Sequence, residues 1–264
     1  MDYINTRTEA QAMSELSTRR DVLSAQSMYV AKGNALIQKS RYSLSLVEQK
    51  AVLFLISKIK PTDEAGHSYI FSIKDFCKTC NFNENSGFYT SYVRQIVEEL
   101  GKKTIAIDLG EGRTLISHWF SSVIIDANTN SFEVCFDTNL APYFFQLKSF
   151  YTQYSLEYVL PMKSKYSIRL YELLRSVKSK SHRQRFTVEE LRERVDCQKY
   201  SAYKEFRRNV LEPAIEDINK YTDLDVRYEP IKTGRKITHI EFVILLNSDP
   251  ERHYNRRREL GATR

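Results

Sequence analysis

The chain has 264 residues, of which 42% are hydrophobic and 28% are charged, and its formal net charge is +7. Such a composition is typical of a folded globular protein rather than a disordered one, and the length suits two domains with separate cores. The excess of basic residues favours a polyanionic partner.

The sequence shows no sign of a membrane or secretory segment. No apolar run approaches the roughly 18 residues of a membrane span. The polar, mixed-charge start lacks the apolar core of a signal peptide. We therefore expect a cytoplasmic protein that does not contact a membrane.

The four cysteines, Cys77, Cys80, Cys135 and Cys197, are too few and too scattered for a disulfide framework. Cys77 and Cys80 form a CxxC pair, but no second pair of ligands follows at the spacing of a zinc site. We expect buried or half-buried thiols, with no metal and no cofactor.

The first half of the chain predicts helices followed by strands. Ser72 is a favourable N-cap for a short helix, and Gly101 is a favourable C-cap for a longer one. In chain order, the expected elements are a core helix within 44–59, an extended segment at 69–71, helices at 72–80 and 88–100, and strands at 104–109, 115–125 and 132–136. A hairpin turn is expected at 110–113.

The second half predicts the same order of elements. Thr187 is an N-cap, and Glu190 completes a capping box. Pro213 predicts a bend in the third helix near Glu212. The expected elements are helices at 163–177, 187–195 and 200–221, followed by strands at 225–228 and 236–246 that flank a basic turn at 232–235.

The two halves also match residue by residue. Phe71-Ser72-Ile73 aligns with Phe186-Thr187-Val188, and after a shift of one residue Arg94 aligns with Arg208. Shared caps, apolar positions and an arginine indicate a duplicated unit. We predict an α+β fold of two tandem winged-helix domains related by internal duplication. The predicted parts are an N-terminal arm at 1–31, a first domain at 32–148, a second domain at 149–247 and a basic tail at 248–264.

Five stretches in this order carry a resemblance to a known family: NALIQKSRYSLSLVEQKAVLFLISKI at 34–59, FSIKDFCKTC at 71–80, YSIRLYELL at 166–174, FTVEELRERV at 186–195 and YKEFRRNVLEPAIEDINKYTDL at 203–224. They resemble the iteron-binding, theta-type plasmid replication initiators, which carry two winged-helix domains in tandem. The resemblance runs from residue 32 to residue 246.

The resemblance implies an initiator that binds repeats in a plasmid origin, helps to open an adjacent A·T-rich segment and recruits the host initiator and replicative helicase. It further implies that monomers bind double-stranded origin DNA while homodimers repress the protein's own promoter.

The helix expected at 200–221 has an apolar stripe on one side and cations on the other, a shape that fits a DNA major groove. Exposed cations on a helix are often only solvated, so this pattern alone leaves DNA binding open. Arg207 and Arg208 are candidates for base contacts because a guanidinium can bond a guanine at two atoms. The candidates in this domain are Lys199, Ser201, Lys204, Arg207 and Arg208, with Lys232, Arg235 and Lys236 on the wing.

A basic cluster precedes this helix. Between residues 163 and 185 there are eight basic residues against one acid, Glu172. Cations close to phosphates supply affinity that is independent of sequence and falls steeply with salt. The cluster consists of Lys163, Lys165, Arg169, Arg175, Lys178, Lys180, Arg183 and Arg185.

The first domain has a weaker set of candidates. Glu98 and Glu99 follow its third helix and lower the positive charge there, so we predict that the second domain dominates recognition. The first domain then adds a weaker contact or serves in dimerisation. Its candidates are Ser91, Arg94 and Gln95 on the helix, Lys102 and Lys103 after it, and Arg113 at the wing tip. The apolar stretch 115–136 suits either a sheet core or a dimer interface, and core is the simpler expectation.

Two alternatives use the same DNA target. A rolling-circle nickase needs a tyrosine nucleophile and usually a metal held by paired histidines, but no HxH pair occurs. Tyr92 and Tyr171 lie at apolar helix positions that favour a core role, and no nucleotide-binding P-loop is present. We therefore predict a protein without catalytic residues. A winged-helix transcriptional regulator stays open, because it would use the same surface.

Overall fold

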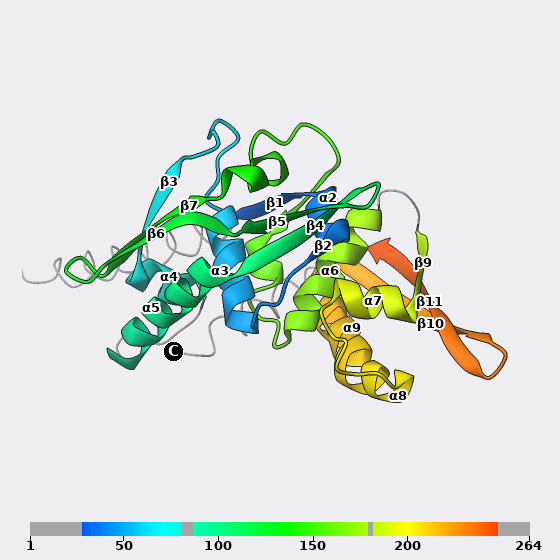
Figure 1. The fold of residues 1–264 in the computed structure, drawn as a ribbon. Coiled ribbons are helices and arrows are strands. Elements are labelled where there is room, and N and C mark those ends of the chain that lie inside the picture. Colours follow the sequence, from blue (N-terminus) through cyan, green and yellow to red (C-terminus); the bar gives the residue numbers. More distant parts are fainter. Residues whose placement is uncertain (1–27, 81–86, 179–181, 248–264) are drawn as a thin grey trace, which may run out of the picture.

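The computed structural model describes residues 28–80, 87–178 and 182–247 (Figure 1). The predicted basic tail at 248–264 and residues 1–27 of the predicted arm lie outside the described residues. Figure 1 shows two helix-and-hairpin units at opposite ends of the molecule, with α6 and β1 between them.

The first unit consists of helices packed on a three-stranded antiparallel sheet. Its elements are α3 (Leu46–Ile56), β3 (Ser68–Ser72), α4 (Ile73–Thr79), α5 (Gly87–Lys102), β6 (Phe120–Asp126) and β7 (Ser131–Phe136). In the sheet, β7 lies between β3 and β6. Helices α4 and α5 form a helix-turn-helix, and the β6–β7 hairpin is the wing.

The second unit repeats this arrangement. Its elements are α6 (Lys165–Lys178), β9 (Arg183–Thr187), α7 (Val188–Arg194), α8 (Tyr203–Phe206), the π-helical turn η3 (Arg207–Leu211), α9 (Glu212–Tyr221), β10 (Leu224–Thr233) and β11 (Lys236–Leu246). Here β11 lies between β9 and β10. The shared order of elements and strands confirms the predicted α+β fold of two duplicated winged helices.

Further segments connect the two units. They are β1 (Tyr29–Gly33), α2 (Asn34–Lys39), β2 (Ser40–Arg41), β4 (Thr104–Gly110), β5 (Arg113–His118), η1 (Thr138–Tyr143), β8 (Tyr151–Ser155) and η2 (Leu156–Tyr158). Strand β1 pairs antiparallel with β8, so residues 29–31, predicted as part of the arm, belong to a paired strand. The predicted boundary after residue 148 falls in the loop before β8 and stays a prediction. No helix in the described part of the chain is long and apolar enough to cross a membrane.

The predicted N-terminal helix caps follow the sequence with one exception. Ser72 and Thr187 each accept a backbone hydrogen bond as N-caps, as predicted. The capping box predicted at Thr187 is incomplete, because the Glu190 carboxylate pairs with Arg194 instead of turning back to the cap. A complete capping box occurs at Ser45, where α3 begins.

The first wing differs from the predicted one. The strand predicted at 115–125 is broken at Trp119, and β4 and β5 form a separate sheet with β2. Trp119 is fully buried, with its ring 4.9 Å from that of Tyr42, so burial of the indole turns the chain from one sheet into the next. Arg113 therefore lies on the β4–β5 hairpin, and its prediction as a wing-tip residue is wrong.

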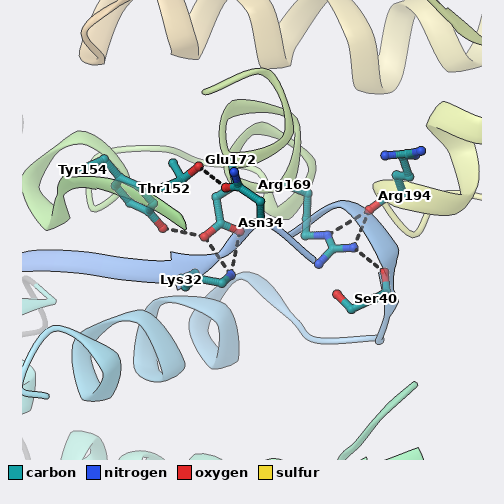
Figure 2. Close-up of polar contacts among 8 residues, drawn as sticks. All are labelled: Lys32, Asn34, Ser40, Thr152, Tyr154, Arg169, Glu172 and Arg194. Atoms are coloured by element: carbon teal, nitrogen blue, oxygen red, sulfur yellow. Dashed lines mark hydrogen bonds and ion pairs between the residues drawn. The ribbon is translucent and has the colours of Figure 1, made fainter. Parts of the chain in front are cut away.

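A buried ion pair joins the N-terminal segment to α6 (Figure 2). Lys32 Nζ lies 2.8 Å from Glu172 Oε1, and the two side chains are 1% and 2% exposed. The Tyr154 hydroxyl, on β8, donates to the same carboxylate oxygen at 2.5 Å. Glu172, predicted as the lone acid of the basic cluster, therefore has a structural role.

Arg169 is also buried against this segment (Figure 2). Its guanidinium donates to the carbonyl oxygens of Ser40 and Arg194 and lies 3.9 Å from the Tyr42 ring centre. Because Ser40 lies on β2 and Arg194 ends α7, this side chain ties the connecting segment to the second unit.

Candidate nucleic-acid interface

The second helix of the second helix-turn-helix is continuous but not uniform, and we call residues 203–221 its recognition helix. α8 runs into the π-turn, where the Glu212 N–H donates to the Arg207 carbonyl oxygen, and α9 follows. Pro213 lies in the first turn of α9. The predicted bend near Glu212 is therefore a change of hydrogen-bond pattern rather than a break. Phe206 and Val210 are buried and fix one face to the core.

On the exposed face of the recognition helix, Arg207 and Arg208 differ in their contacts, a difference that the sequence alone does not show. Lys204 and Arg208 are exposed and have no ion-pair or hydrogen-bond partner among the described residues. Arg207, in contrast, has its Nε 3.3 Å from Glu212 Oε1, and each side chain of this pair is 49% exposed. Lys204 and Arg208 are thus the cations most available to a polyanion.

The turn before the recognition helix carries Lys199 and Ser201. The hydrogen bond that the Lys199 ammonium donates to Tyr200, and then the proximity of Tyr166, raise the pKa of Lys199, so it stays charged at neutral pH. The Ser201 carbonyl oxygen accepts a hydrogen bond from Arg192 Nη2 at 2.6 Å. Arg192, on α7, also lies 5.5 Å from the Phe206 ring centre. Arg192 thus positions the start of the recognition helix, although no local motif in the sequence marks it.

The wing of the second unit presents three cations. Lys232, Arg235 and Lys236 are exposed near the tip of the β10–β11 hairpin and have no partner in the described part of the chain. Gly234, at φ 61°, forms the turn without strain. Figure 1 shows this hairpin and the recognition helix at the same end of the molecule.

Half of the basic cluster predicted at 163–185 forms ion pairs within the protein, although the Arg183 and Arg185 side chains stay 65% and 57% exposed and share one carboxylate. Arg169 is buried, whereas Lys163 stays exposed. Lys180 lies outside the described residues. The pairs are Lys165 with Asp196 at 2.6 Å, Arg175 with Asp223 at 3.1 Å, and Arg183 and Arg185 with Glu241 at 3.0 Å each. The charge excess counted along the sequence is therefore not a free patch, because the acids that balance it come from other elements.

The matching face of α5 in the first unit is less cationic. Ser91 and Gln95 are exposed. Arg94 Nη2 donates to Asn130 Oδ1 at 2.7 Å and to the Ala127 carbonyl oxygen at 3.2 Å, so it is held by the turn of its own wing. Arg94 and Arg208, matched in the sequence, therefore differ in their contacts.

The end of α5 is also paired internally. The helix continues through Gly101, predicted as its C-cap, to Lys102. Lys102 Nζ lies 3.1 Å and 3.0 Å from two glutamates of the same helix, and Lys103 Nζ lies 3.7 Å from Glu48 Oε1. These two lysines add less free charge than their exposure suggests.

Other reactive groups are buried. All four cysteines are free and buried, as predicted, and burial raises the pKa of the Cys80 and Cys197 thiols to about 12. The Tyr171 hydroxyl donates to Asp223 Oδ1 at 2.9 Å; burial, then this carboxylate, raises its pKa well above the ordinary value, which disfavours a nucleophile. Within the described ranges, no group of three or more histidine, cysteine or acidic residues could hold a metal ion.

Comparisons with known proteins agree with this architecture. The family model for the initiator replication protein WH1 domain matches residues 29–175, and the model for the initiator Rep protein WH2 domain matches residues 187–244. A replication initiation protein of Escherichia coli is 26% identical over 219 residues, which cover 79% of this chain and 67% of the relative. The crystal structure of the Pi initiator protein in complex with iteron DNA has the same fold, with a TM-score of 0.68 at 18% identity over 85% of this chain and 99% of that one. The chain belongs to the family of initiator replication proteins with WH1 and WH2 domains.

Proposed function

We propose that this chain initiates plasmid replication by binding repeated sequences in the replication origin. The observation that carries the proposal is the exposed, unpaired set of cations on the recognition helix and wing of the second unit. Family membership supports it, and so does the likeness to the Pi initiator, which was crystallised with iteron DNA.

Within this surface, the residues have different roles. Arg208 is the candidate for a base contact, because an unpaired guanidinium can bond both acceptors of a guanine edge. Lys204 lies one turn before it and approaches the same groove. Lys199, Ser201 and the wing cations contact phosphates and fix the register on the duplex.

The first unit makes a weaker contact with DNA. Arg94, Lys102 and Lys103 are all engaged by groups of the protein, so binding DNA would first break those contacts. Ser91 and Gln95 offer neutral hydrogen-bonding groups instead. Recognition by the second unit therefore dominates.

A second copy of the chain is a further partner. Strand β5 lies at the edge of the β2–β4–β5 sheet, and its Ile116 side chain is 72% exposed. An edge strand that exposes an isoleucine can pair with the same strand of another copy. Ile125, the other candidate in the apolar stretch, packs against the core of the first unit. An equilibrium between monomer and homodimer follows.

The remaining parts of the proposal rest on family membership. The chain acts without catalysis in the bacterial cytoplasm, opens A·T-rich DNA beside its repeats, recruits the host initiator and helicase, and represses its own promoter as a dimer.

The test is a footprint of the purified chain on DNA from its own locus, with a parallel search for protein joined covalently to DNA. Protection of evenly spaced direct repeats, without an adduct, is the expected result. Protection of a lone inverted repeat would favour a transcriptional regulator, and a tyrosine joined to a nicked phosphate would identify a nickase.

A further inference from the structure

The π-turn brings together two residues that a regular α-helix would separate. Side chains five positions apart lie on different faces of an α-helix. Here the Glu212 N–H donates to the Arg207 carbonyl oxygen, and Arg207 Nε lies 3.3 Å from Glu212 Oε1. The backbone and the side chains thus join the same two residues, immediately beside Arg208.

The carboxylate of this pair lies close to two tyrosines. Burial first, and then the neighbouring Tyr203 and Glu212, raise the pKa of Tyr228 on β10. The Tyr203 hydroxyl is buried next to the pair and has no hydrogen-bond partner among the described residues. Glu212 therefore lies beside the wing strand as well as on its own helix.

The pair is accessible and weak enough to exchange partners. Arg207 and Glu212 are each 49% exposed, and an exposed ion pair contributes little to stability because water screens it. A DNA phosphate offers the same guanidinium two oxygens. Glu212 and the DNA backbone therefore compete for Arg207, and the carboxylate also repels approaching phosphates.

We propose that Glu212 lowers the affinity of the recognition helix for DNA of any sequence by withholding Arg207 from the phosphate contacts that every duplex offers. This inference rests on the proposed function. With Arg207 paired to Glu212, the recognition helix presents Lys204 and Arg208, and affinity for unrelated DNA stays low. Without Glu212, Arg207 becomes one more sequence-independent cation.

The experiment compares the full chain with Glu212→Gln, Arg207→Gln and the double variant on two duplexes over a salt series. One duplex carries the repeats of its own locus and the other has the same composition in scrambled order. Glu205→Gln is the matched control, because Glu205 is an exposed acid of the same helix without a partner among the described residues. All variants alter exposed or half-exposed side chains, and thermal unfolding verifies that each is folded.

Glu212→Gln is expected to raise affinity severalfold on both duplexes and to steepen the salt dependence by about 0.9 in log–log slope, the value for one added phosphate contact. Arg207→Gln cancels the effect in the double variant. An unchanged affinity and slope in Glu212→Gln, or an equal change in Glu205→Gln, overturns the inference while leaving the proposed function standing. If the unaltered chain does not prefer the repeat duplex, the proposed function fails, and the inference that rests on it fails with it.

Discussion

Lys32 and Glu172 lie 140 positions apart in the sequence and form an ion pair that is almost completely shielded from water. The pair connects β1 to α6, and Tyr154 adds a hydrogen bond to the same carboxylate. Because α6 also packs against α9, this contact links the N-terminal segment to the unit that carries the recognition helix. The N-terminal segment is therefore fixed to the second unit by a specific buried polar contact.

Replacing Lys32 with methionine is expected to lower the free energy of unfolding by about 3–5 kcal/mol, because it leaves the buried Glu172 carboxylate without its cation. The double variant Lys32→Met, Glu172→Leu should recover much of this loss. Guanidinium denaturation measures the free energy of unfolding of the single and the double variant. A loss below about 1 kcal/mol in the single variant would contradict the structural role of the pair.

Neutralising the wing tests its proposed phosphate contacts. Lys232→Gln with Lys236→Gln should weaken binding about equally on repeat and scrambled duplexes, because phosphates carry no sequence information. The slope of log affinity against log salt should fall by about 0.9 for each phosphate that the wing no longer neutralises. Arg113→Gln, which removes a charge from the other hairpin, is the control and should leave the slope unchanged. A weakening confined to the repeat duplex would assign the wing to base recognition instead.

Because the cysteine thiols are buried, we expect them to react slowly with alkylating reagents in the native chain. Since burial raises the pKa of Cys80 and Cys197 from 9.0 to about 12, very little thiolate exists at pH 8. Iodoacetamide should therefore label these cysteines slowly in buffer and quickly in denaturant, as followed by mass spectrometry. Labelling in buffer at the rate of an unfolded cysteine would show that these thiols are not buried.

The raised pKa values of Cys80 and Cys197 also determine whether the free energy of unfolding rises or falls with pH. Above pH 9 the unfolded chain releases thiol protons that the native chain retains until about pH 12, so the unfolded state binds fewer protons. The free energy of unfolding should consequently fall as pH rises through this interval. Cys80→Ala and Cys197→Ala variants should each show a smaller fall than the unaltered chain.

Substitutions at Ile116 and Ile125 test whether each side chain belongs to a dimer interface or to the core of the first unit. Ile116→Lys alters an exposed side chain on β5, so it should leave the melting temperature nearly unchanged and shift the chain towards monomers in sedimentation velocity runs. Ile125→Lys should instead destabilise the first unit, because Ile125 packs on its core. An unchanged association state in folded Ile116→Lys would remove β5 from the dimer proposal.

The repeated order of elements could be predicted because local signals set it. The N-caps Ser72 and Thr187 and the periodic apolar residues are readable along the chain. The pairing of charges could not be predicted, because Asp196, Asp223 and Glu241 approach the basic cluster only after folding. The hairpin at 110–113 forms as predicted, but the break at Trp119 depends on a tertiary contact, so the sequence did not show that this hairpin lies outside the wing.

The contrast between Arg207 and Arg208 had a similar origin. Both arginines precede Pro213 on what the sequence suggests is one helix. Only the π-turn, which no local signal marks, turns Arg207 towards Glu212 and leaves Arg208 unpaired. The candidate set was therefore identified from the sequence, while the ranking within it came from the structure.

The most direct test of the account is the affinity of Arg208→Ala for the repeat duplex and for its scrambled counterpart at fixed salt. Removal of a base contact should cost about 1–3 kcal/mol on the repeat duplex and much less on the scrambled one. Equal affinity of Arg208→Ala and the unaltered chain for the repeat duplex would contradict the claim that this face of the recognition helix reads DNA sequence.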